Sequence, residues 1–470
     1  MFIRVLLLVV FAAGAAPAGA LEVLELQPVD FGATVTQIVA SQDGSRLFLI
    51  ARDVDPSSTY RLLVWDVPTW KLVKEIALPA PPYGMAWCEG KLVVSCPTAR
   101  PNTLRAVPGG TIAIIDPVTL AIQSQIAGKT GKRIATPLAV LRYAPKGKAV
   151  LSVRRTAEGE DVGEDAITVE LDLKSGALTP LTRRHTVHAA FLEDRILQQH
   201  FPGSPAGAIE HYSLAECRKA KGTARPVVAD IWNADYSPLR MVHGGAAFVS
   251  THAWYETTLF DAKTLAKTWS VCGQIIDVIE PASLVVMAEY VYPDAPEVKD
   301  SCHLIGIDAK SSRTAWRARL KLPQPLRYGV YRWRPPPTAL VTGTDGDHLL
   351  MAFGDVEAME VARDFRWYRA RLPAKRADGP ALTVFDKTPP TQLVVGEKLE
   401  LKVVKDRSET GALVLQSGPP GVAFDAETGK LAWTAADMGR AKQDIVIGLT
   451  DGDVVIPVLR FPLHVAAPRR

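Results

Sequence analysis

A short turn pattern recurs along most of the chain and constrains its fold more than any other feature. The pattern is an apolar strand, an Asp, two variable residues, a Thr or Ser, and a second strand. The five clear copies have their turn residues at Asp66 and Thr69, Asp116 and Thr119, Asp172 and Ser175, Asp261 and Thr264, and Asp308 and Ser311. An Asp carboxylate accepts hydrogen bonds from the backbone N–H groups that follow it, and the hydroxyl closes the same turn. Each copy therefore predicts a tight reversal between two antiparallel strands.

Two weaker copies make the repeat regular. Ser213 takes the Asp place in one of them, and Asp355 provides the acid in the other. Successive copies lie roughly 48 residues apart, which is enough for four strands. A single four-stranded sheet cannot bury both of its faces, whereas seven such sheets packed in a ring can. The chain is therefore predicted to be all-β, with a seven-bladed β-propeller over residues 21–372.

The repeat resembles the YVTN/WD40-like β-propeller family. It departs from true WD40 repeats because the Gly-His element is missing and the Trp-Asp pair occurs once, at Trp65 and Asp66. The resemblance implies the fold strongly and the chemistry hardly at all, because propellers carry many unrelated functions.

A different pattern follows Leu372. Residues 373–387 form a predicted linker rich in Pro, Gly and Lys, and residues 388–467 alternate short strands with turns, as in an Ig/cadherin-like β-sandwich. The segment 417–434 is similar to dystroglycan-type cadherin-like (Ig-like) domains, with Trp433 as the expected core aromatic. That family name suggests calcium, but we expect no metal and no cofactor. The nearby carboxylates lack the converging ligands that Ca²⁺ requires, and they are Asp406, Glu409, Asp451 and Asp453.

The first twenty residues predict export. One cation, an apolar run and the small residues Ala18 and Ala20 form a signal peptide over residues 1–20. A buried N-terminal strand or helix is the alternative. The apolar run is too short to span a membrane, so we expect a secreted, periplasmic or cell-surface protein without a transmembrane segment. Nucleic acid is not an expected partner, because 54 Lys and Arg residues are scattered among 50 Asp and Glu residues.

Five cysteines are too few for a disulfide scaffold. Cys272 and Cys302 fall in what the spacing assigns to the sixth repeat, so they could form a bridge in an oxidising compartment. The alternative, with all five thiols reduced and buried, stays open.

No motif identifies a catalytic residue. The segment 127–132 imitates a phosphate-binding loop but has Gln123 where the first glycine is required. Motifs of serine hydrolases, zinc proteases and dinucleotide-binding folds do not occur. Quinoprotein dehydrogenases are also propellers, but the vicinal Cys-Cys pair that would brace pyrroloquinoline quinone is missing.

Two stretches combine aromatic residues with arginine, as binding surfaces often do. The candidate ligand-binding residues are Arg327, Tyr328, Arg332, Trp333, Arg334, Trp254 and Tyr255. The alternative is that these aromatics fill space between blades.

These observations favour an exported, non-catalytic binding or scaffold protein. It would take a protein or polysaccharide on the propeller loop face, with the sandwich as a spacer or adhesion module. The alternative is a propeller enzyme, namely a lyase, hydrolase or quinoprotein-like oxidoreductase, with its site at the mouth of the central channel.

Overall fold

A computed structural model describes residues 21–466 with several internal gaps. The gaps are residues 53–60, 99–108, 128, 131–132, 141–145, 157–165, 183–188, 192–194, 200–207, 221–226, 233–238, 243–244, 253–255, 281, 290–300, 322–338, 344–345, 354–365, 391, 438–442 and 452–453. Within the described residues the chain is nearly all β, and α1 (Leu214–Ala220) is the one α-helix.

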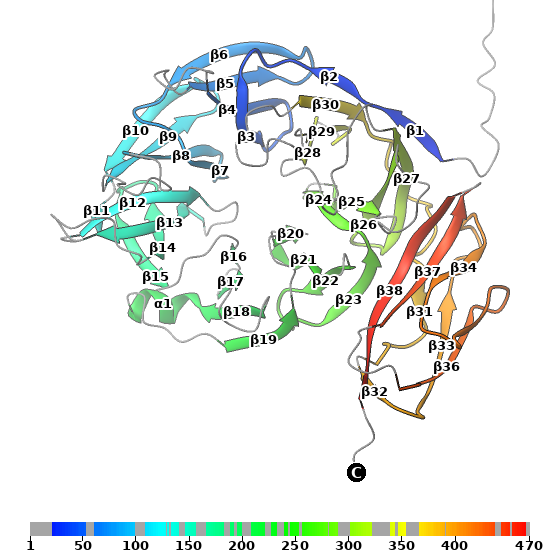
Figure 1. The fold of residues 1–470 in the computed structure, drawn as a ribbon. Coiled ribbons are helices and arrows are strands. Elements are labelled where there is room, and N and C mark those ends of the chain that lie inside the picture. The colour runs from blue at the N-terminus through cyan, green and yellow to red at the C-terminus, as the bar shows by residue number, and fades with distance from the viewer. Residues whose placement is uncertain are drawn as a thin grey trace, which may run out of the picture.

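Seven sheets follow one another around a ring in the described part of the chain (Figure 1), and this arrangement confirms the predicted propeller. Blade 1 contains β3 (Thr34–Ala40), β4 (Arg46–Arg52), β5 (Arg61–Asp66) and β6 (Lys71–Ala77). Blade 2 contains β7 (Gly84–Cys88), β8 (Lys91–Pro97), β9 (Gly110–Asp116) and β10 (Ala121–Ala127). Blade 3 contains β11 (Lys129–Thr130), β12 (Arg133–Val140), β13 (Lys148–Thr156), β14 (Ala166–Asp172) and β15 (Leu178–Thr182). Neighbouring strands within these three blades pair antiparallel.

The remaining four blades complete the ring. Blade 4 contains β16 (Ala189–Phe191), β17 (Arg195–Gln199), β18 (Ala208–Ser213) and β19 (Val227–Trp232), and blade 5 contains β20 (Arg240–Val242), β21 (Ala247–His252), β22 (Glu256–Asp261) and β23 (Lys267–Cys272). Blade 6 contains β24 (Gln274–Ile279), β25 (Leu284–Glu289), β26 (Ser301–Asp308) and β27 (Arg313–Lys321). Blade 7 contains β28 (Ala339–Thr342), β29 (His348–Phe353) and β30 (Arg366–Arg371). In Figure 1 the first strands of blades 1, 2, 4, 5, 6 and 7 lie nearest the centre of the ring.

The N-terminal segment closes the ring. β2 (Gln27–Val29) pairs antiparallel with β30 and completes blade 7, and β1 (Glu22–Glu25) pairs in parallel with β27 of blade 6. At the same junction the carbonyl of Gly44 in blade 1 accepts hydrogen bonds from the Thr342 hydroxyl and the Gly343 N–H, at 3.0 and 2.9 Å. Because the closing strand comes from the start of the chain, the first and last blades are held together by backbone hydrogen bonds.

The hydrophobic core lies between the blades. Phe48 and Ile50 of β4 are fully buried and pack with Val94 and Ile115 of blade 2. Similar clusters join blades 2 and 3, and blades 6 and 7. Each fully buried aliphatic or aromatic side chain stabilises the fold by about 1.5–3 kcal/mol. A blade therefore depends on its neighbours for much of its stability.

The Asp turns join the last two strands of their blades. In blade 5, Oδ1 of Asp261 accepts the N–H groups of Lys263 and Thr264 at 3.1 and 2.7 Å, and the Thr264 hydroxyl at 2.7 Å. Blades 1, 2, 3 and 6 have equivalent turns at Asp66, Asp116, Asp172 and Asp308. In blade 4, Oγ of Ser213 accepts the Glu216 N–H at 3.3 Å, and α1 follows.

Two further four-stranded sheets form the C-terminal unit. One contains β31 (Val384–Phe385), β33 (Lys398–Val404), β36 (Lys430–Thr434) and β35 (Ala423–Asp425), and the other contains β32 (Gln392–Val394), β38 (Val454–Ala466), β37 (Gln443–Asp451) and β34 (Leu413–Ser417). Both sheets contribute to one core, in which Trp433 is buried and donates a hydrogen bond from Nε1 to the Pro420 carbonyl at 3.0 Å.

The structure does not test the possible bridge between Cys272 and Cys302, because the Cys302 side chain lies outside the described residues. Cys272 ends β23 in blade 5 and carries a buried thiol, whereas Cys302 lies on β26 in blade 6. The spacing of the repeat had assigned both residues to one blade, because it fixes the turns but not the strand boundaries. Cys88, Cys96 and Cys217 are also buried thiols, and burial raises the pKa of Cys88 and Cys96 to about 12.

Candidate functional site

The candidate ligand-binding residues predicted from the sequence lie outside the described residues. Trp254 and Tyr255 fall between β21 and β22, and the residues from Arg327 to Arg334 fall between β27 and β28. Asp355, the acid of the seventh repeat, also lies outside the described part.

The turn carboxylates hold backbone structure. At Asp261, hydrogen bonds from the backbone and hydroxyl of Thr264 lower the pKa, and at Asp172 the ammonium group of Lys148 and the bonds from Ser175 lower the pKa further. These carboxylates therefore stay ionised and engaged within their own turns.

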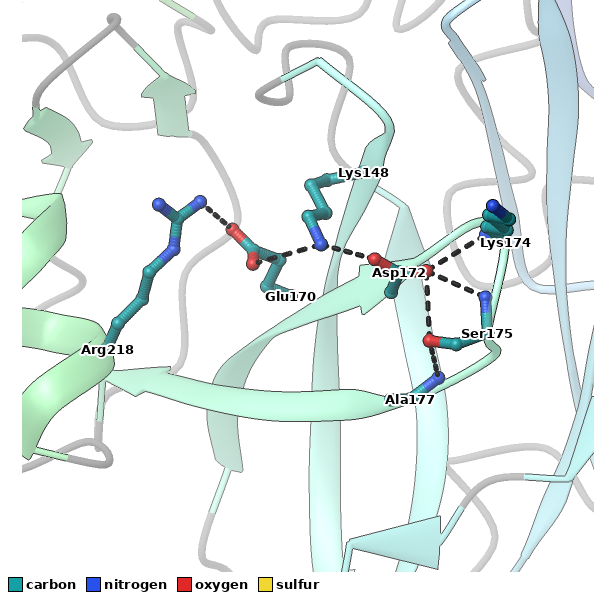
Figure 2. A network of polar contacts seen from close by, with 7 residues as sticks. All are labelled: Lys148, Glu170, Asp172, Lys174, Ser175, Ala177 and Arg218. Carbon is teal, nitrogen blue, oxygen red and sulfur yellow. Dashed lines mark hydrogen bonds and ion pairs between the residues drawn. The ribbon is translucent and has the colours of Figure 1, made fainter.

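One turn extends into a larger polar network between blades 3 and 4 (Figure 2). Lys148 contacts Asp172, and its Nζ also lies 4.0 Å from Oε1 of Glu170. Arg218 of α1 reaches across from blade 4 and places Nη2 2.7 Å from Oε2 of Glu170. The Glu170 side chain is only 7% exposed. Two cations and two carboxylates balance each other here, so this network joins two blades and has no excess charge for a ligand.

A second buried carboxylate lies at the innermost strands of the ring. Asp277 follows a bulge in β24, and its residue is only 5% exposed. Oδ2 accepts the Val341 N–H of β28 at 3.0 Å, while Oδ1 accepts the Val278 N–H at 2.9 Å and lies 3.9 Å from Nε of Arg240 on β20. The carboxylate therefore lies where the innermost strands of blades 5, 6 and 7 meet.

This arrangement places the Asp277 carboxylate beside the Arg240 guanidinium on the innermost strands of the propeller. A buried carboxylate is costly unless it is paired and hydrogen-bonded, and Asp277 has both kinds of partner. The Arg240 side chain is 20% exposed, whereas the Asp277 side chain is 7% exposed. A carboxylate can transfer a proton, and a guanidinium can hold an anionic group.

A neutral residue takes the equivalent position in blade 1. Gln37 also follows a bulge in its innermost strand, and its amide donates to the Met85 carbonyl of blade 2 at 3.4 Å. Both side chains therefore link one blade to the next, but only the one in blade 6 is charged.

Sequence reasoning did not single out Asp277. The signal was an acid inside the apolar strand Gln274–Ile279, where a buried charge is costly. Its partners Arg240 and Val341 are distant in sequence, so only the ring shows the pairing. Among the described residues, no group of three His, Cys, Asp or Glu side chains is placed to hold a metal ion. No described helix is long and apolar enough to cross a membrane.

Comparison with solved structures shows likenesses of fold. No family model and no curated protein matches the chain. A solved structure of oligogalacturonate lyase in complex with manganese is similar over 76% of this chain and 98% of that one, with 15% sequence identity and a TM-score of 0.45. The expectation of a non-catalytic binding or scaffold protein is corrected by this comparison, because the similar propeller is an enzyme. At this identity the likeness concerns the fold, and the chemistry of this chain depends on its own residues.

Proposed function

We propose that the chain is an enzyme of the lyase or hydrolase class, with its site at the mouth of the central channel. The observation that carries this proposal is the pairing of Asp277 with Arg240 across the innermost strands of blades 5 and 6. Charged groups held together in a poorly solvated place are frequent at catalytic sites, where their surroundings tune proton transfer.

The two side chains suit complementary roles. Asp277 would transfer a proton, taking it from a substrate carbon or from the attacking water. Arg240 would hold the negative charge that develops beside the breaking bond. A guanidinium favours substrates with planar anionic groups, so we propose carboxylated polysaccharides as the substrate class.

We also propose that residues 1–20 are a signal peptide and that the mature chain is exported. The composition of this segment supports the proposal. The Ig/cadherin-like assignment of the C-terminal unit is supported by its two sheets and by the buried Trp433.

The test is an activity screen of the purified protein against polyuronates and neutral polysaccharides. A lyase releases unsaturated ends that absorb in the ultraviolet, whereas a hydrolase releases reducing ends without that absorbance. The Asp277→Asn variant should lose about 100-fold or more in kcat/KM, the size expected for a general acid or base.

The Asn carbonyl oxygen can still accept the Val341 N–H, but its amide nitrogen would face the Val278 N–H and Arg240, so some loss of stability is expected. The thermal midpoint of the variant is therefore measured as well, and activity is compared at a temperature where both proteins are folded. Full activity in Asp277→Asn would remove Asp277 from the mechanism. A fully folded wild-type protein that acts on none of the anionic substrates would overturn the proposed substrate class.

A further inference from the structure

Two buried threonines of blade 5 contact the strand that carries Asp277. Thr251 on β21 and Thr257 on β22 lie opposite each other in the β21–β22 ladder, and the two residues are 1% and 0% exposed. Their hydroxyl oxygens are 2.9 Å apart. Thr257 donates to the Gly273 carbonyl at 2.8 Å, and Thr251 accepts the Ile275 N–H at 3.3 Å. We call these two side chains the threonine clamp.

The direction of every hydrogen bond in the clamp is fixed. A hydroxyl has one proton to donate, and a carbonyl oxygen can only accept. Because Thr257 donates its proton to the Gly273 carbonyl, Thr251 must donate to the Thr257 oxygen. The chain of bonds therefore runs from the Ile275 N–H through both hydroxyls to the Gly273 carbonyl. Blade 5 thus binds a backbone donor and a backbone acceptor at the point where the chain enters blade 6.

The backbone bound by the clamp is tightly packed. Gly273 lies between β23 and β24 with a φ of 135°, in the region that favours glycine. An added Cβ would lie 2.8 Å from the Ala288 carbonyl oxygen of β25 and 2.9 Å from Cε of Met287. Asp277 comes two residues after Ile275, across the bulge in β24. The strand therefore has little freedom to shift between the clamp and the carboxylate.

Strand β21 also sets the position of Arg240. Arg240 on β20 pairs with Val249 of β21, two residues before Thr251. One strand is therefore bonded to β20 through the ladder and to β24 through the Thr251 hydroxyl. Nε of Arg240 lies 3.9 Å from Oδ1 of Asp277, and this separation depends on where the clamp holds β24.

We propose that Thr251 and Thr257 are positioning residues, which align the Asp277 carboxylate with the Arg240 guanidinium. The consequence for catalysis rests on the proposed function, whereas the alignment of the ion pair does not. Without the clamp, β24 can shift relative to β20, so the two charged groups lose their alignment. A displacement of about 1 Å at a reacting group can cost about 100-fold in rate. The clamp therefore affects the reaction without contacting the substrate.

The first measurement requires no enzymatic activity. A double-mutant cycle with Arg240→Gln and Asp277→Asn gives the coupling of the two side chains in the unfolding equilibrium of the full chain. We expect a coupling of about fivefold or more with the clamp intact. It should fall below about twofold in the Thr257→Val background, because Val keeps the shape of the side chain and removes the hydroxyl.

The matched control is Thr258→Val, at the next position of β22. The Thr258 hydroxyl lies 2.6 Å from that of Ser270 within blade 5. Successive side chains of a strand point to opposite faces, so this variant breaks a hydroxyl pair on the face of blade 5 opposite the clamp. The Thr258→Val background should keep the coupling even if the protein is less stable. Full coupling in Thr257→Val, or equal loss in Thr258→Val, would overturn the proposal.

A second clamp variant decides if Thr257→Val does not fold. Thr251→Val leaves the bond from Thr257 to the Gly273 carbonyl in place and removes the acceptor of the Ile275 N–H. The coupling of Arg240 with Asp277 should fall in this background too. Full coupling there would contradict the proposal in the same way.

The second measurement is kinetic, with polygalacturonate or alginate as the substrate. Thr257→Val should lower kcat about tenfold or more and change KM less than about threefold. Thr257→Ser keeps the hydroxyl and should restore kcat. In the Asp277→Asn background, Thr257→Val should cost less than about twofold further, because the clamp acts through Asp277.

The two measurements separate failure of the clamp from failure of the proposed function. If Asp277→Asn loses activity but Thr257→Val keeps full kcat, the positioning role is rejected and the proposed function stands. If the wild-type protein has no activity on either substrate, the proposed substrate class is rejected. The unfolding cycle then still decides whether Thr251 and Thr257 align the ion pair.

Discussion

A single backbone position recurs at the end of every described Asp turn. The residue after the Thr or Ser has a positive φ, and its N–H returns to the Asp carbonyl in three of these turns. The residues and their φ values are Trp70 (52°), Leu120 (54°), Gly176 (73°), Leu265 (59°) and Ser312 (56°). This left-handed conformation suits glycine and is strained for other residues. Four of the five turns therefore hold a side chain where glycine would fit better.

Exchanging side chains at this position should change stability in both directions. Gly176→Ala should lower the free energy of unfolding by about 1 kcal/mol, because a Cβ there meets Ile126 only at ordinary contact distance and the backbone strain remains. Ser312→Gly should raise the free energy of unfolding by a few tenths of a kcal/mol, up to about 1 kcal/mol. Urea unfolding measures both. Equal and same-signed effects would contradict the conformational explanation.

The turn residues could be predicted because each turn is local. An Asp and a Thr three residues apart contain the whole hydrogen-bonding pattern, as in Asp261 and Thr264. Asp277 could not be predicted in the same way, because its partners come from two other blades. The sequence shows an acid in an apolar strand, but not which charge it meets.

At the level of elements, blades are joined by polar bridges as well as by apolar cores. The contact of Arg218 on α1 with Glu170 on β14 is the clearest case (Figure 2). Helix α1 replaces the tight turn of blade 4 and thereby carries Arg218 toward blade 3. The degraded repeat at Ser213 indicated a different connection, but nothing in the sequence indicated its partner.

Removing this bridge should destabilise the protein. Arg218→Ala should lower the free energy of unfolding by about 2 kcal/mol, because among the described residues the buried Glu170 then keeps Lys148 as its one ion-pair partner. The matched control is Lys267→Ala, which breaks a more exposed pair with Glu256 and should cost less than about 0.5 kcal/mol. Chemical denaturation compares the two. Equal losses would show that burial of the carboxylate does not matter.

For the whole molecule, closure of the ring depends on contacts between the two ends of the propeller. The repeat predicted seven blades and their order, since stacked sheets need a closed ring to bury their faces. It did not predict that β2 completes blade 7 or that residues 375–382, predicted to be linker, pair with blade 6. Both are pairings between distant segments, and no local pattern encodes their register.

A glycine at the ring junction tests closure. In Gly44→Ala, the new Cβ would lie 2.1 Å from the Gly343 oxygen, so blades 1 and 7 would have to separate. The free energy of unfolding should fall by about 3 kcal/mol or more. The control is Gly32→Ala, which has a similar positive φ but nothing within 4 Å, and should cost about 1 kcal/mol. Similar losses in the two variants would mean that the junction is loosely packed.

The central claim is that Asp277 and Arg240 form one catalytic site on the innermost strands of the propeller. Its most direct test is a double-mutant cycle on kcat/KM with Arg240→Gln and Asp277→Asn. Because blades 5 and 6 hold the two side chains together, the double variant should lose far less than the product of the two single losses. The expected coupling is at least tenfold, or about 1.4 kcal/mol. Losses that multiply independently, or single variants that keep full activity, would contradict a shared site at the innermost strands.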